Sequence, residues 1–303
     1  MPSPDELARL LGVSPATIVA VEDLTRGWAT TTRSLLVTTG GGGRLVVQLG
    51  APSRASRSAV ARRMRVGEAL AVRAPRLGVT DVLGGDPLAS PGPWLATRYV
   101  EGTSGSELLD DDAGAARLGA AAGAVARAIA AVSPAGLGLS RRWAAAGTLQ
   151  AVAAGWVSAV AVEGARPLLA RIPAILEASP PALAHGDLAP VNLVIRGGRV
   201  TGLLDLERAR IAPAAFDAAW FRLMILVHHP ERWGAAGPAF LAARGFSDDA
   251  RTAALLDDLA ALACLELAAG ARAGSSLRGT WSARAAGALR GEAATWGREP
   301  LNG

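Results

Sequence analysis

The chain has 303 residues, of which 50% are hydrophobic and 19% are charged, so it can bury the core of one large or two smaller domains. Its net charge of +5 is modest for this length and does not by itself indicate a nucleic-acid-binding protein. The single cysteine, Cys264, excludes an intramolecular disulfide, and its apolar neighbours predict a core residue rather than a nucleophile. No signal peptide and no apolar stretch of ~18 residues are recognisable, so we expect a cytoplasmic protein without a membrane span.

The first hundred residues predict a mainly antiparallel sheet, with a short helix before the first strand and a longer helix between the third and fourth strands. Alternating apolar residues predict the strands, and a run of four glycines, Gly40 to Gly43, predicts a tight turn between two of them. The expected helices are 4–11 and 53–72, and the expected strands are 19–24, 34–39, 44–49, 78–83 and 94–100.

The remaining two thirds of the chain predict a mostly helical region. An Ala-rich helix is expected over 113–132, and helical segments recur to about Glu177, where two prolines follow. A short hairpin is expected across Gly197-Gly198. Long helices are expected over 214–228 and 248–271, with a further helix or tail after Gly274.

The most informative part of the sequence is the stretch 184–192, AHGDLAPVN, followed by LLDLE at 203–207. Phosphoryl transfer needs one carboxylate to orient or deprotonate the attacking hydroxyl, and it needs oxygen ligands that hold Mg²⁺ on the nucleotide phosphates. Asp187 suits the first role, and Asn192 and Asp205 suit the second. A polar turn and a polar strand end would explain each residue alone, but the combination at these spacings favours the catalytic interpretation.

These residues resemble the aminoglycoside phosphotransferase and choline-kinase-like group, which shares the two-lobed protein-kinase fold. The kinase catalytic loop reads H-R-D-x-x-x-x-N, and Gly186 takes the place of the arginine, as is usual in that group. The stretch 204–207, LDLE, is similar to the second metal motif of the group. Asp217 matches a further aspartate that braces the catalytic loop by accepting backbone hydrogen bonds.

The resemblance implies an α+β fold with a small antiparallel-sheet lobe and a mostly helical large lobe. The expected nucleotide-binding lobe is 1–98, the hinge is 99–102, and the catalytic and acceptor-binding lobe is 103–303. Tyr99 and Val100 in the hinge would contact the nucleotide.

The implied function is Mg²⁺-dependent transfer of the γ-phosphate of ATP or GTP to a hydroxyl of a small molecule such as an antibiotic or metabolite. Asp187 would be the catalytic residue, Asn192 and Asp205 the metal ligands, and Glu207 a supporting residue. A Ser or Thr of a peptide in natural-product maturation is an alternative acceptor. A non-catalytic nucleotide-binding protein or scaffold is an alternative of another class.

The nucleotide-binding end departs from the family pattern. The loop 24–31, expected over the phosphates, has one glycine, Gly27, and the third strand carries Gln48 where kinases have a basic residue. Glu68 is expected to be the helix glutamate that anchors whichever group replaces that residue. A neutral amide supplies no charge, so its presence should weaken transition-state stabilisation by about 3 kcal/mol or more unless another group compensates.

Three readings of Gln48 remain open. An arginine from elsewhere substitutes, either Arg44 on the same strand face or Arg33 on the neighbouring strand, although each is also readable as a solvated edge residue. Alternatively, Gln48 suffices with Mg²⁺, or the protein is a pseudokinase. The three intact residues Asp187, Asn192 and Asp205 argue against the last reading.

Two further patterns have simpler explanations. Residues 5–18 resemble a helix-turn-helix, but two short helices cannot bury a core alone, so we expect one helix packed on the small lobe. Nucleic acid is therefore not an expected partner. Several arginines on the helix 53–72 predict a solvated basic face: Arg54, Arg57, Arg62, Arg63 and Arg65. Acidic groups in the large lobe predict helix caps: Asp110 to Asp112 and Asp248-Asp249.

Overall fold

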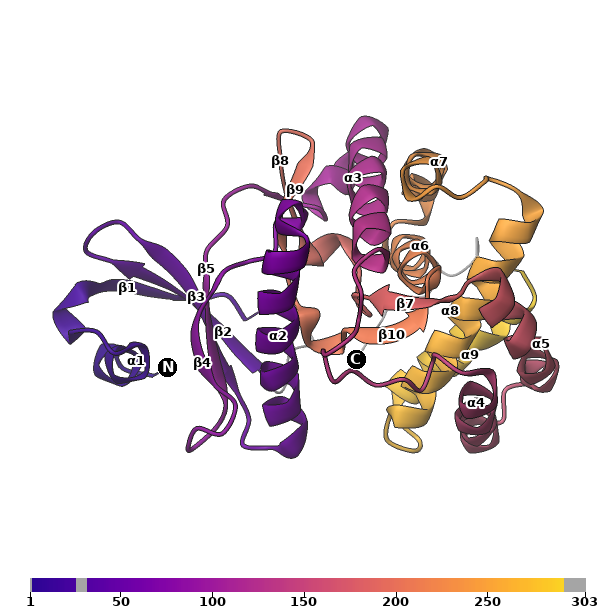
Figure 1. Cartoon of the computed structure of the whole chain (residues 1–303), viewed down its shortest axis with the longest axis horizontal. Coiled ribbons are helices and arrows are strands. Elements are labelled where there is room, and N and C mark those ends of the chain that lie inside the picture. The colour runs from indigo at the N-terminus through magenta and orange to yellow at the C-terminus, as the bar shows by residue number, and fades with distance from the viewer. Residues whose placement is uncertain (1, 26–31, 292–303) are drawn as a thin grey trace. The chain divides into compact units, whose positions relative to one another are not determined.

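The computed structural model describes residues 2–25 and 32–291 of the chain. The described chain forms two compact units, of which the first comprises Met1–Glu101 with Thr201–Glu207 and the second comprises Gly102–Val200 with Arg208–Gly303 (Figure 1). The return of Thr201–Glu207 to the first unit differs from the sequence-based division. It follows from a backbone hydrogen bond, 2.8 Å long, that the Leu203 N–H donates to the Gly78 carbonyl oxygen.

The first unit contains a five-stranded antiparallel sheet in the order β1-β2-β3-β5-β4. Gly42, with φ of +76°, lies in the predicted turn between β2 and β3, where a residue with a side chain would be strained. The strands are β1 (Ile18–Asp23), β2 (Thr32–Thr39), β3 (Arg44–Gly50), β4 (Val82–Asp86) and β5 (Trp94–Arg98).

The two helices of the first unit lie on opposite faces of this sheet (Figure 1). Helix α1 (Pro4–Leu11) begins at a Ser3–Glu6 capping box and buries Leu7 against the sheet, in a core cluster that includes Val47. Because neighbouring residues of a strand point to opposite faces, Gln48 points to the other side. Helix α2 (Arg54–Arg73) packs on β3, β4 and β5 from that side.

The predicted strand over 78–83 is wrong. Gly78 follows a 3₁₀ turn, η2 (Pro75–Leu77), and adopts a left-handed conformation with φ of +66°, so the strand begins only at Val82. The real strand, β4, continues through Gly84, where the ring of Trp94 packs so closely that a Cβ atom would lie 3.4 Å from it. Glycine has no strand propensity, and this is why the sequence pattern misplaced the element.

The second unit is built from helices, of which α3 packs along α7 and α8 packs against α6 and α9. Helix α7 was not predicted, because glycines and an internal proline, Pro238, interrupt its pattern. Among the described residues none of the helices combines the length and the apolar character needed to cross a bilayer. The helices are α3 (Asp112–Ala130), α4 (Ala146–Val160), α5 (Ala165–Ala178), α6 (Phe216–His228), α7 (Trp233–Arg244), α8 (Ala250–Gly270) and α9 (Ser276–Leu289).

Short strands hold the segments around the predicted catalytic loop. Strand β7 (Pro181–Ala184), which precedes the loop, pairs antiparallel with β10 (Arg210–Pro213). The predicted hairpin across Gly197-Gly198 is confirmed, with φ of +58° and +73° at the two glycines. It joins β8 (Leu193–Arg196) to β9 (Arg199–Leu203), and β8 also pairs with β6 (Thr103–Ser104).

Candidate active site

A buried carboxylate braces the start of the catalytic loop in the second unit. Asp217, in the first turn of α6, is 3% exposed and accepts backbone hydrogen bonds from His185 N, at 2.7 Å, and Gly186 N, at 2.9 Å. Burial raises the pKa of Asp217, while the charge of His185 and the backbone donors act in the opposite direction. The predicted bracing role of Asp217 is therefore confirmed in its geometry.

Glycine is required where protein kinases carry the loop arginine. Gly186 has φ of +81°, and a Cβ atom at that position would clash with the backbone carbonyl oxygen of Arg208. The close approach arises because Ala184 and Arg210 are paired residues of β7 and β10, which bring the two chain segments together. The positive φ and the nearby carbonyl oxygen thus both require glycine at position 186.

The side chain of Asp187 is held by an indole. Its Oδ1 atom accepts a hydrogen bond, 2.8 Å long, from Trp220 Nε1 on α6, and its backbone N–H donates to His185 Nδ1 at 3.2 Å. Asp187 is half-buried, whereas Trp220 is 4% exposed. One oxygen of the carboxylate is thereby fixed, and the contacts within the described residues leave the other oxygen for a hydroxyl group.

Asn192 is positioned by the same loop. It is 8% exposed, and its Nδ2 atom donates a hydrogen bond of 2.8 Å to the backbone carbonyl of Asp187. Because the nitrogen end of the carboxamide is engaged in this way, the oxygen end is available to a cation. The second unit therefore brings Asp187 and Asn192 together.

In the first unit, the structure brings together Gln48, Arg63 and Asp205. Nη1 of Arg63 donates to Oε1 of Gln48 and lies 3.3 Å from Oδ1 of Asp205. The Asp205 side chain is 36% exposed, and its backbone has φ of +64°, a left-handed conformation that aspartate tolerates better than most residues. Burial lowers the pKa of Arg63, and the charges of Asp205 and Glu207 oppose this change.

The residue of α2 that contacts Gln48 is Arg63, and Glu68 lies elsewhere on the helix. Residues on an α-helix are separated by about 100°, so Glu68 and Arg63, five positions apart, point about 140° away from each other. Glu68 is exposed, and Arg63 lies instead in the buried stripe of α2 with Val66 and Leu70. The residue of α2 that contacts β3 is thus a cation rather than the expected glutamate.

Neither arginine proposed as a substitute for the missing strand cation is free to act as one. Arg33 forms an ion pair with Asp23, with Nη2 and Oδ2 2.7 Å apart. The guanidinium of Arg44 lies 3.8 Å from the centre of the Tyr99 ring, and its Nη1 lies 3.7 Å from Glu101 Oε1. These contacts support the alternative reading of both arginines as solvated residues, although β2 and β3 are interior strands rather than edge strands of the sheet.

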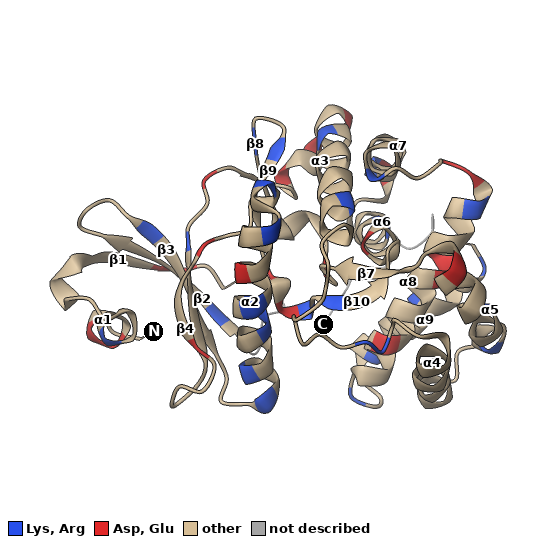
Figure 2. Ribbon diagram, in the orientation of Figure 1, with Lys and Arg blue, Asp and Glu red and all other residues tan. Residues whose placement is uncertain are grey.

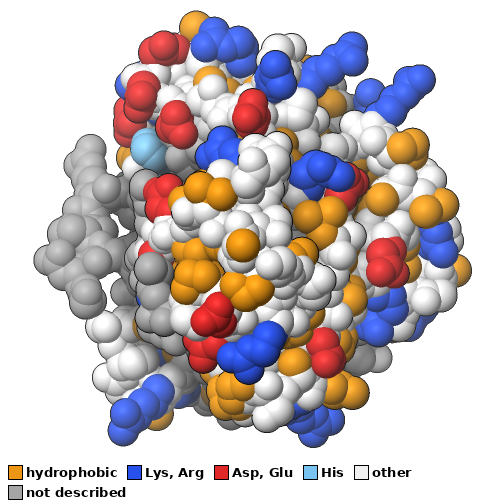
Figure 3. Space-filling model, turned by 90° about the vertical axis from the view of Figure 1, so that its left-hand side faces the viewer, with side chains coloured by type: hydrophobic (Ala, Val, Ile, Leu, Met, Phe, Trp, Pro, Cys, Tyr) orange, Lys and Arg blue, Asp and Glu red, His pale blue; other side chains and the backbone are white. Residues whose placement is uncertain are grey.

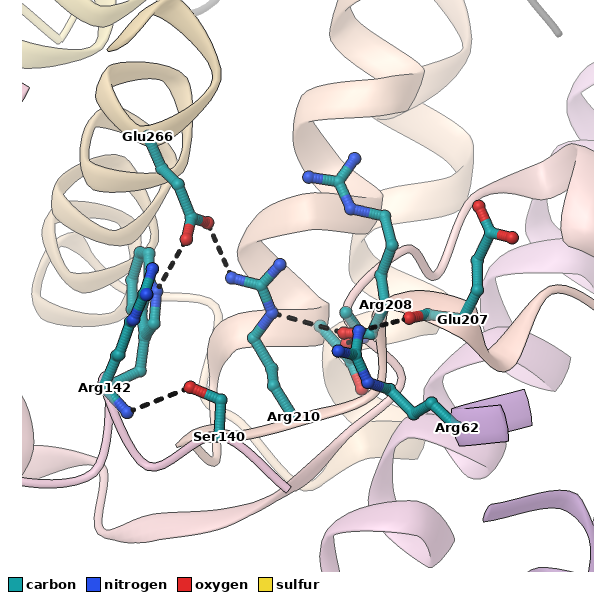
Figure 4. A network of polar contacts seen from close by, with 10 residues as sticks. Arg62, Ser140, Arg142, Glu207, Arg208, Arg210 and Glu266 are labelled. Carbon is teal, nitrogen blue, oxygen red and sulfur yellow. Dashed lines mark hydrogen bonds and ion pairs between the residues drawn. The ribbon is translucent and has the colours of Figure 1, made fainter. Parts of the chain in front are cut away.

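The remaining nucleotide-binding predictions stay predictions. Tyr99 and Val100 follow β5 and are half-buried, and the Tyr99 N–H donates to the Arg44 carbonyl oxygen at 3.1 Å. Gly27 lies outside the described residues. Glu207 contributes its backbone carbonyl, which accepts a hydrogen bond of 2.5 Å from Nη1 of Arg62 on α2 (Figure 4).

The predicted metal ligands have suitable donor atoms. A carboxamide oxygen at Asn192 and a carboxylate at Asp205 are both hard oxygen ligands, which Mg²⁺ prefers. No group of three or more His, Cys, Asp or Glu residues that could hold a metal occurs within the described part of the chain. Such a cluster is not needed, because Mg²⁺ on a nucleotide takes most of its ligands from phosphates and water.

Several acidic residues of the second unit are used as caps or ion-pair partners. Asp111 caps α3 and Asp249 caps α8, as predicted for these acidic groups. The Glu266 carboxylate accepts from Nη1 of Arg210 at 2.6 Å, and its other oxygen lies 3.5 Å from the Trp143 indole nitrogen (Figure 4). Two more carboxylates of α8 are paired in the same way, Asp257 with Arg222 and Asp258 with Arg171.

Two other predictions concern residues outside the site. Cys264 is fully buried, and burial raises the pKa of its thiol to about 12, so it is a core residue, as predicted. The helix-turn-helix alternative is contradicted, because α1 is followed only by a single 3₁₀ turn, η1 (Pro15–Thr17). On the face drawn in Figure 3, basic and acidic side chains are interspersed with hydrophobic ones.

Sequence reasoning missed two residues that contact the predicted ones, Arg63 in the first unit and Trp220 in the second. Arg63 was assigned to a solvated face, yet its spacing from Val66 and Leu70 places it on the apolar stripe of α2, and that spacing was readable. Trp220 follows Asp217 by three residues on a helix, so both were predictable as neighbours on one helix face. That the indole would donate to Asp187 depends on the fold of the loop and has no local signal.

Comparison with known proteins supports this assignment of the fold. The chain aligns with a thermostable mutant of aminoglycoside phosphotransferase APH(4)-Ia in complex with ADP and hygromycin B, with a TM-score of 0.69 and 13% identity over 95% of this chain and 98% of that one. It aligns with the GDP and kanamycin complex of APH(2")-IIia with a TM-score of 0.67 and 16% identity, over 94% and 96% of the two chains. For macrolide 2'-phosphotransferase MphH from Brachybacterium faecium the values are 0.57 and 22%, over 89% and 92%.

These identities show a shared fold, and the sequence itself shows the family. No curated protein sequence gives a significant match. The sequence profile described as the phosphotransferase enzyme family matches residues 23–264, which is most of the chain and includes the catalytic loop. The chain therefore belongs to the phosphotransferase enzyme family and is a phosphotransferase that acts on a hydroxyl group.

Proposed function

We propose that the protein transfers the γ-phosphoryl group of Mg²⁺-bound ATP or GTP to a hydroxyl of a small molecule. The observation that carries the proposal is the arrangement around Asp187. One oxygen of its carboxylate is held by Trp220 at 2.8 Å, and the loop that carries it is braced by Asp217. A carboxylate fixed in this way is preorganised to orient an attacking hydroxyl.

The remaining roles follow from the donor atoms. Asp187 accepts or orients the proton of the acceptor hydroxyl, and Asn192 and Asp205 each offer an oxygen ligand to Mg²⁺. The Mg²⁺-nucleotide supplies the phosphoryl group and neutralises part of its charge. Tyr99 and Val100 would contact the nucleotide, as the family resemblance implies.

For the acceptor, the ion pairs of the second unit favour a neutral or weakly cationic molecule. A polycationic aminoglycoside would be bound by unpaired carboxylates, whereas those of Asp257, Asp258 and Glu266 are engaged by arginines at 2.5 to 2.6 Å. The solved relatives include complexes with kanamycin and hygromycin B and a macrolide phosphotransferase. We expect turnover with a macrolide to exceed turnover with kanamycin or hygromycin B when all three are offered with ATP and with GTP.

The proposal is tested first by calorimetric titration of ATP and GTP, each with and without Mg²⁺. Binding of either nucleotide that depends on Mg²⁺ is the expected result. An acceptor panel followed by mass spectrometry would then identify a product heavier by one phosphoryl group. A folded protein that binds neither nucleotide would refute the proposal and favour the scaffold alternative.

The variant Asp187→Asn separates an enzyme from a nucleotide-binding scaffold. It retains the size of the side chain and one oxygen for the Trp220 N–H, but it removes the charge that orients the hydroxyl. We expect turnover to fall by at least about 10²-fold with nucleotide affinity unchanged. Asp248→Asn, at an exposed carboxylate of the same unit, is the matched control and should retain full turnover.

A further inference from the structure

A buried arginine in the first unit has no role in the proposed function so far. Basic residues recur along α2 (Figure 2), and Arg63 is 8% exposed whereas Arg54, Arg65 and Arg73 are exposed. Burying a guanidinium is costly unless it is paired, and the cost is tolerated mainly where the charge is used or compensated. The Asp205 carboxylate, 3.3 Å away and 36% exposed, provides partial compensation.

The contacts of Gln48 show which end of its amide faces the cation. Oε1 accepts from Arg63 Nη1, and Nε2 lies 3.4 Å from the hydroxyl oxygen of Ser34 on the neighbouring strand. Residues 34 and 48 are directly paired between β2 and β3, so the amide is held on both sides. Gln48 is therefore an acceptor for Arg63, and its amide nitrogen is directed to Ser34 rather than to a nucleotide.

Donor capacity remains on the guanidinium. Both contacts described for Arg63 use Nη1, whereas a guanidinium carries five N–H donors on three nitrogens. Arg63 also lines a small cavity of the first unit together with Gln48, Gly50, Thr32, Ser56 and the acidic residue Glu207. The fixed cation and the two hydroxyl groups in the wall are donors suited to an anion, and the negative charge of Glu207 opposes them.

We propose that Arg63 is the phosphate-binding cation of this phosphotransferase, with Gln48 as the residue that positions it. In protein kinases a lysine on the third strand binds the phosphates and pairs with a glutamate on the following helix. Here the same two elements are in contact, but the cation is on the helix and a neutral acceptor is on the strand. This inference rests on the proposed function, because it requires that a nucleoside triphosphate binds.

The test compares ATP with adenosine, which lacks phosphates, by calorimetric titration in the presence of Mg²⁺. Arg63→Gln removes the charge, and Arg63→Lys keeps the charge and serves as a variant less disruptive to folding. Arg54→Gln, at an exposed position of the same helix, is the matched control. Circular dichroism establishes that each variant is folded.

The expected result is specific to the phosphates. Loss of a charge-assisted hydrogen bond should weaken ATP binding by Arg63→Gln about 10- to 100-fold. Adenosine binding should be unchanged, Arg63→Lys should bind ATP more tightly than Arg63→Gln, and Arg54→Gln should match the wild type. Unchanged ATP binding by folded Arg63→Gln, or an equal loss of ATP and adenosine binding, would overturn the inference.

The positioning role of Gln48 is tested separately, by the ATP and adenosine affinities of two variants at position 48. Gln48→Glu keeps an oxygen that accepts from Arg63, whereas Gln48→Leu removes it. ATP affinity should fall in Gln48→Leu and be retained in Gln48→Glu, while adenosine affinity stays constant in both. If the two variants weaken ATP binding equally, the positioning role is wrong.

The two proposals fail in different ways. Wild-type protein that binds neither ATP nor GTP would refute the proposed function and this inference together. Wild-type protein that binds Mg²⁺-ATP, with an Arg63→Gln variant that binds it equally well, would refute only the inference.

Discussion

At the residue scale, the proposed catalytic carboxylate depends on a small set of donors. Asp187 is oriented by the indole of Trp220, and its loop is oriented by Asp217. Each of these contacts is a hydrogen bond to an acidic side chain, the class that contributes most per bond. Substitutions that remove a single donor should therefore change turnover without changing the fold.

Trp220→Phe should lower kcat about 10- to 100-fold, because it removes the hydrogen bond that fixes Asp187 Oδ1 but keeps an aromatic ring in the core. Nucleotide affinity should not change. Steady-state kinetics and ATP titration measure the two quantities. Trp281→Phe, at the ring that stacks on Trp220 with centroids 6.3 Å apart, is the control and should leave kcat intact. Equal effects of both substitutions would assign Trp220 a packing role only.

A second prediction concerns Asp23, which precedes the loop expected over the phosphates. Hydrogen bonds from the Thr25 side chain and backbone, and then from Arg33, lower the pKa of Asp23 to about 2. The lowered pKa means that these contacts stabilise the fold above the unfolded-state pKa of about 3.9 and that this stability is lost as the pH falls through about 2. Carbon-detected NMR titration of the carboxyl group should give this value directly.

Thr25→Val removes the hydroxyl and should move the pKa of Asp23 upward toward its ordinary value. The backbone donor of residue 25 remains in this variant, so the shift should be partial. Arg33→Gln should also move the pKa of Asp23 upward, since both the hydrogen bond and the charge of the arginine lower it. A pKa that is unaffected by Thr25→Val would contradict the assignment of the hydroxyl as the main cause.

At the scale of elements, the closest helix packing in the second unit depends on glycine. A Cβ atom at Gly119 or Gly123 of α3 would clash with the carbonyl oxygens of Ala236 and Phe240 of α7. The two helices therefore approach each other most closely where these glycines leave α3 without a side chain. This contact also explains how α7, with its irregular sequence, is held in a helical conformation.

Gly123→Ala should destabilise the protein by about 1–3 kcal/mol, because the added methyl group forces the two helices apart. Gly155→Ala on α4 is the matched control. Nothing lies within 4 Å of a Cβ atom at that exposed position, so it should stabilise by about 0.5–1 kcal/mol through helix propensity. Urea denaturation measures both, and equal effects would disprove the packing argument.

Elements with strong local patterns could be predicted from the sequence. Helix α1, the hairpin of β2 and β3, and helix α2 lie within a few residues of the predicted ranges, and the capping residues Asp111 and Asp249 cap as expected. Local signals sufficed there because turn glycines, caps and periodicity all agree. Strand β4 and helix α7 could not be predicted, since β4 is held by pairing with β5 and α7 is held against the glycines of α3, and neither contact has a local signal.

The candidate site, like the fold, could be predicted only where the signal is local in sequence. The spacing of Asp187, Asn192, Asp205 and Asp217 marked the catalytic loop, because it reflects a local backbone path. The residue that faces β3 from α2 was expected to be Glu68, because the family pattern was followed in place of the helix periodicity. Periodicity would have identified Arg63, and only the folded sheet could show that it meets Gln48.

At the scale of the whole molecule, every one of the 31 basic side chains is an arginine, since the sequence contains no lysine. Whatever binds phosphate through a side-chain cation must therefore do so with a guanidinium. Arginine retains its charge when buried, whereas a buried lysine loses its proton more readily. Arginine is therefore better suited than lysine to supply a positive charge at a buried position such as that of residue 63.

Metal dependence should be measurable as a property of the whole protein. Mg²⁺ with ATP at a hundredfold excess over the dissociation constant should add about 2.7 kcal/mol to stability and raise the midpoint of thermal unfolding. Removal of the metal with EDTA should abolish most of this increase, and Asp205→Asn should reduce it because the negative charge of the ligand is lost. An increase that is the same with EDTA would show that the nucleotide binds without the metal.

The contact between Arg63 and Gln48 also constrains how this protein can evolve. A mutation of Gln48 to lysine alone would place two cations side by side in a largely buried position, and a mutation of Arg63 to glutamate alone would leave the phosphates without a cation. Each single step toward the strand-lysine arrangement therefore passes through a weakened intermediate. Descendants of this sequence should keep the pair or exchange both residues together. The residue at position 48 should therefore predict the residue at position 63.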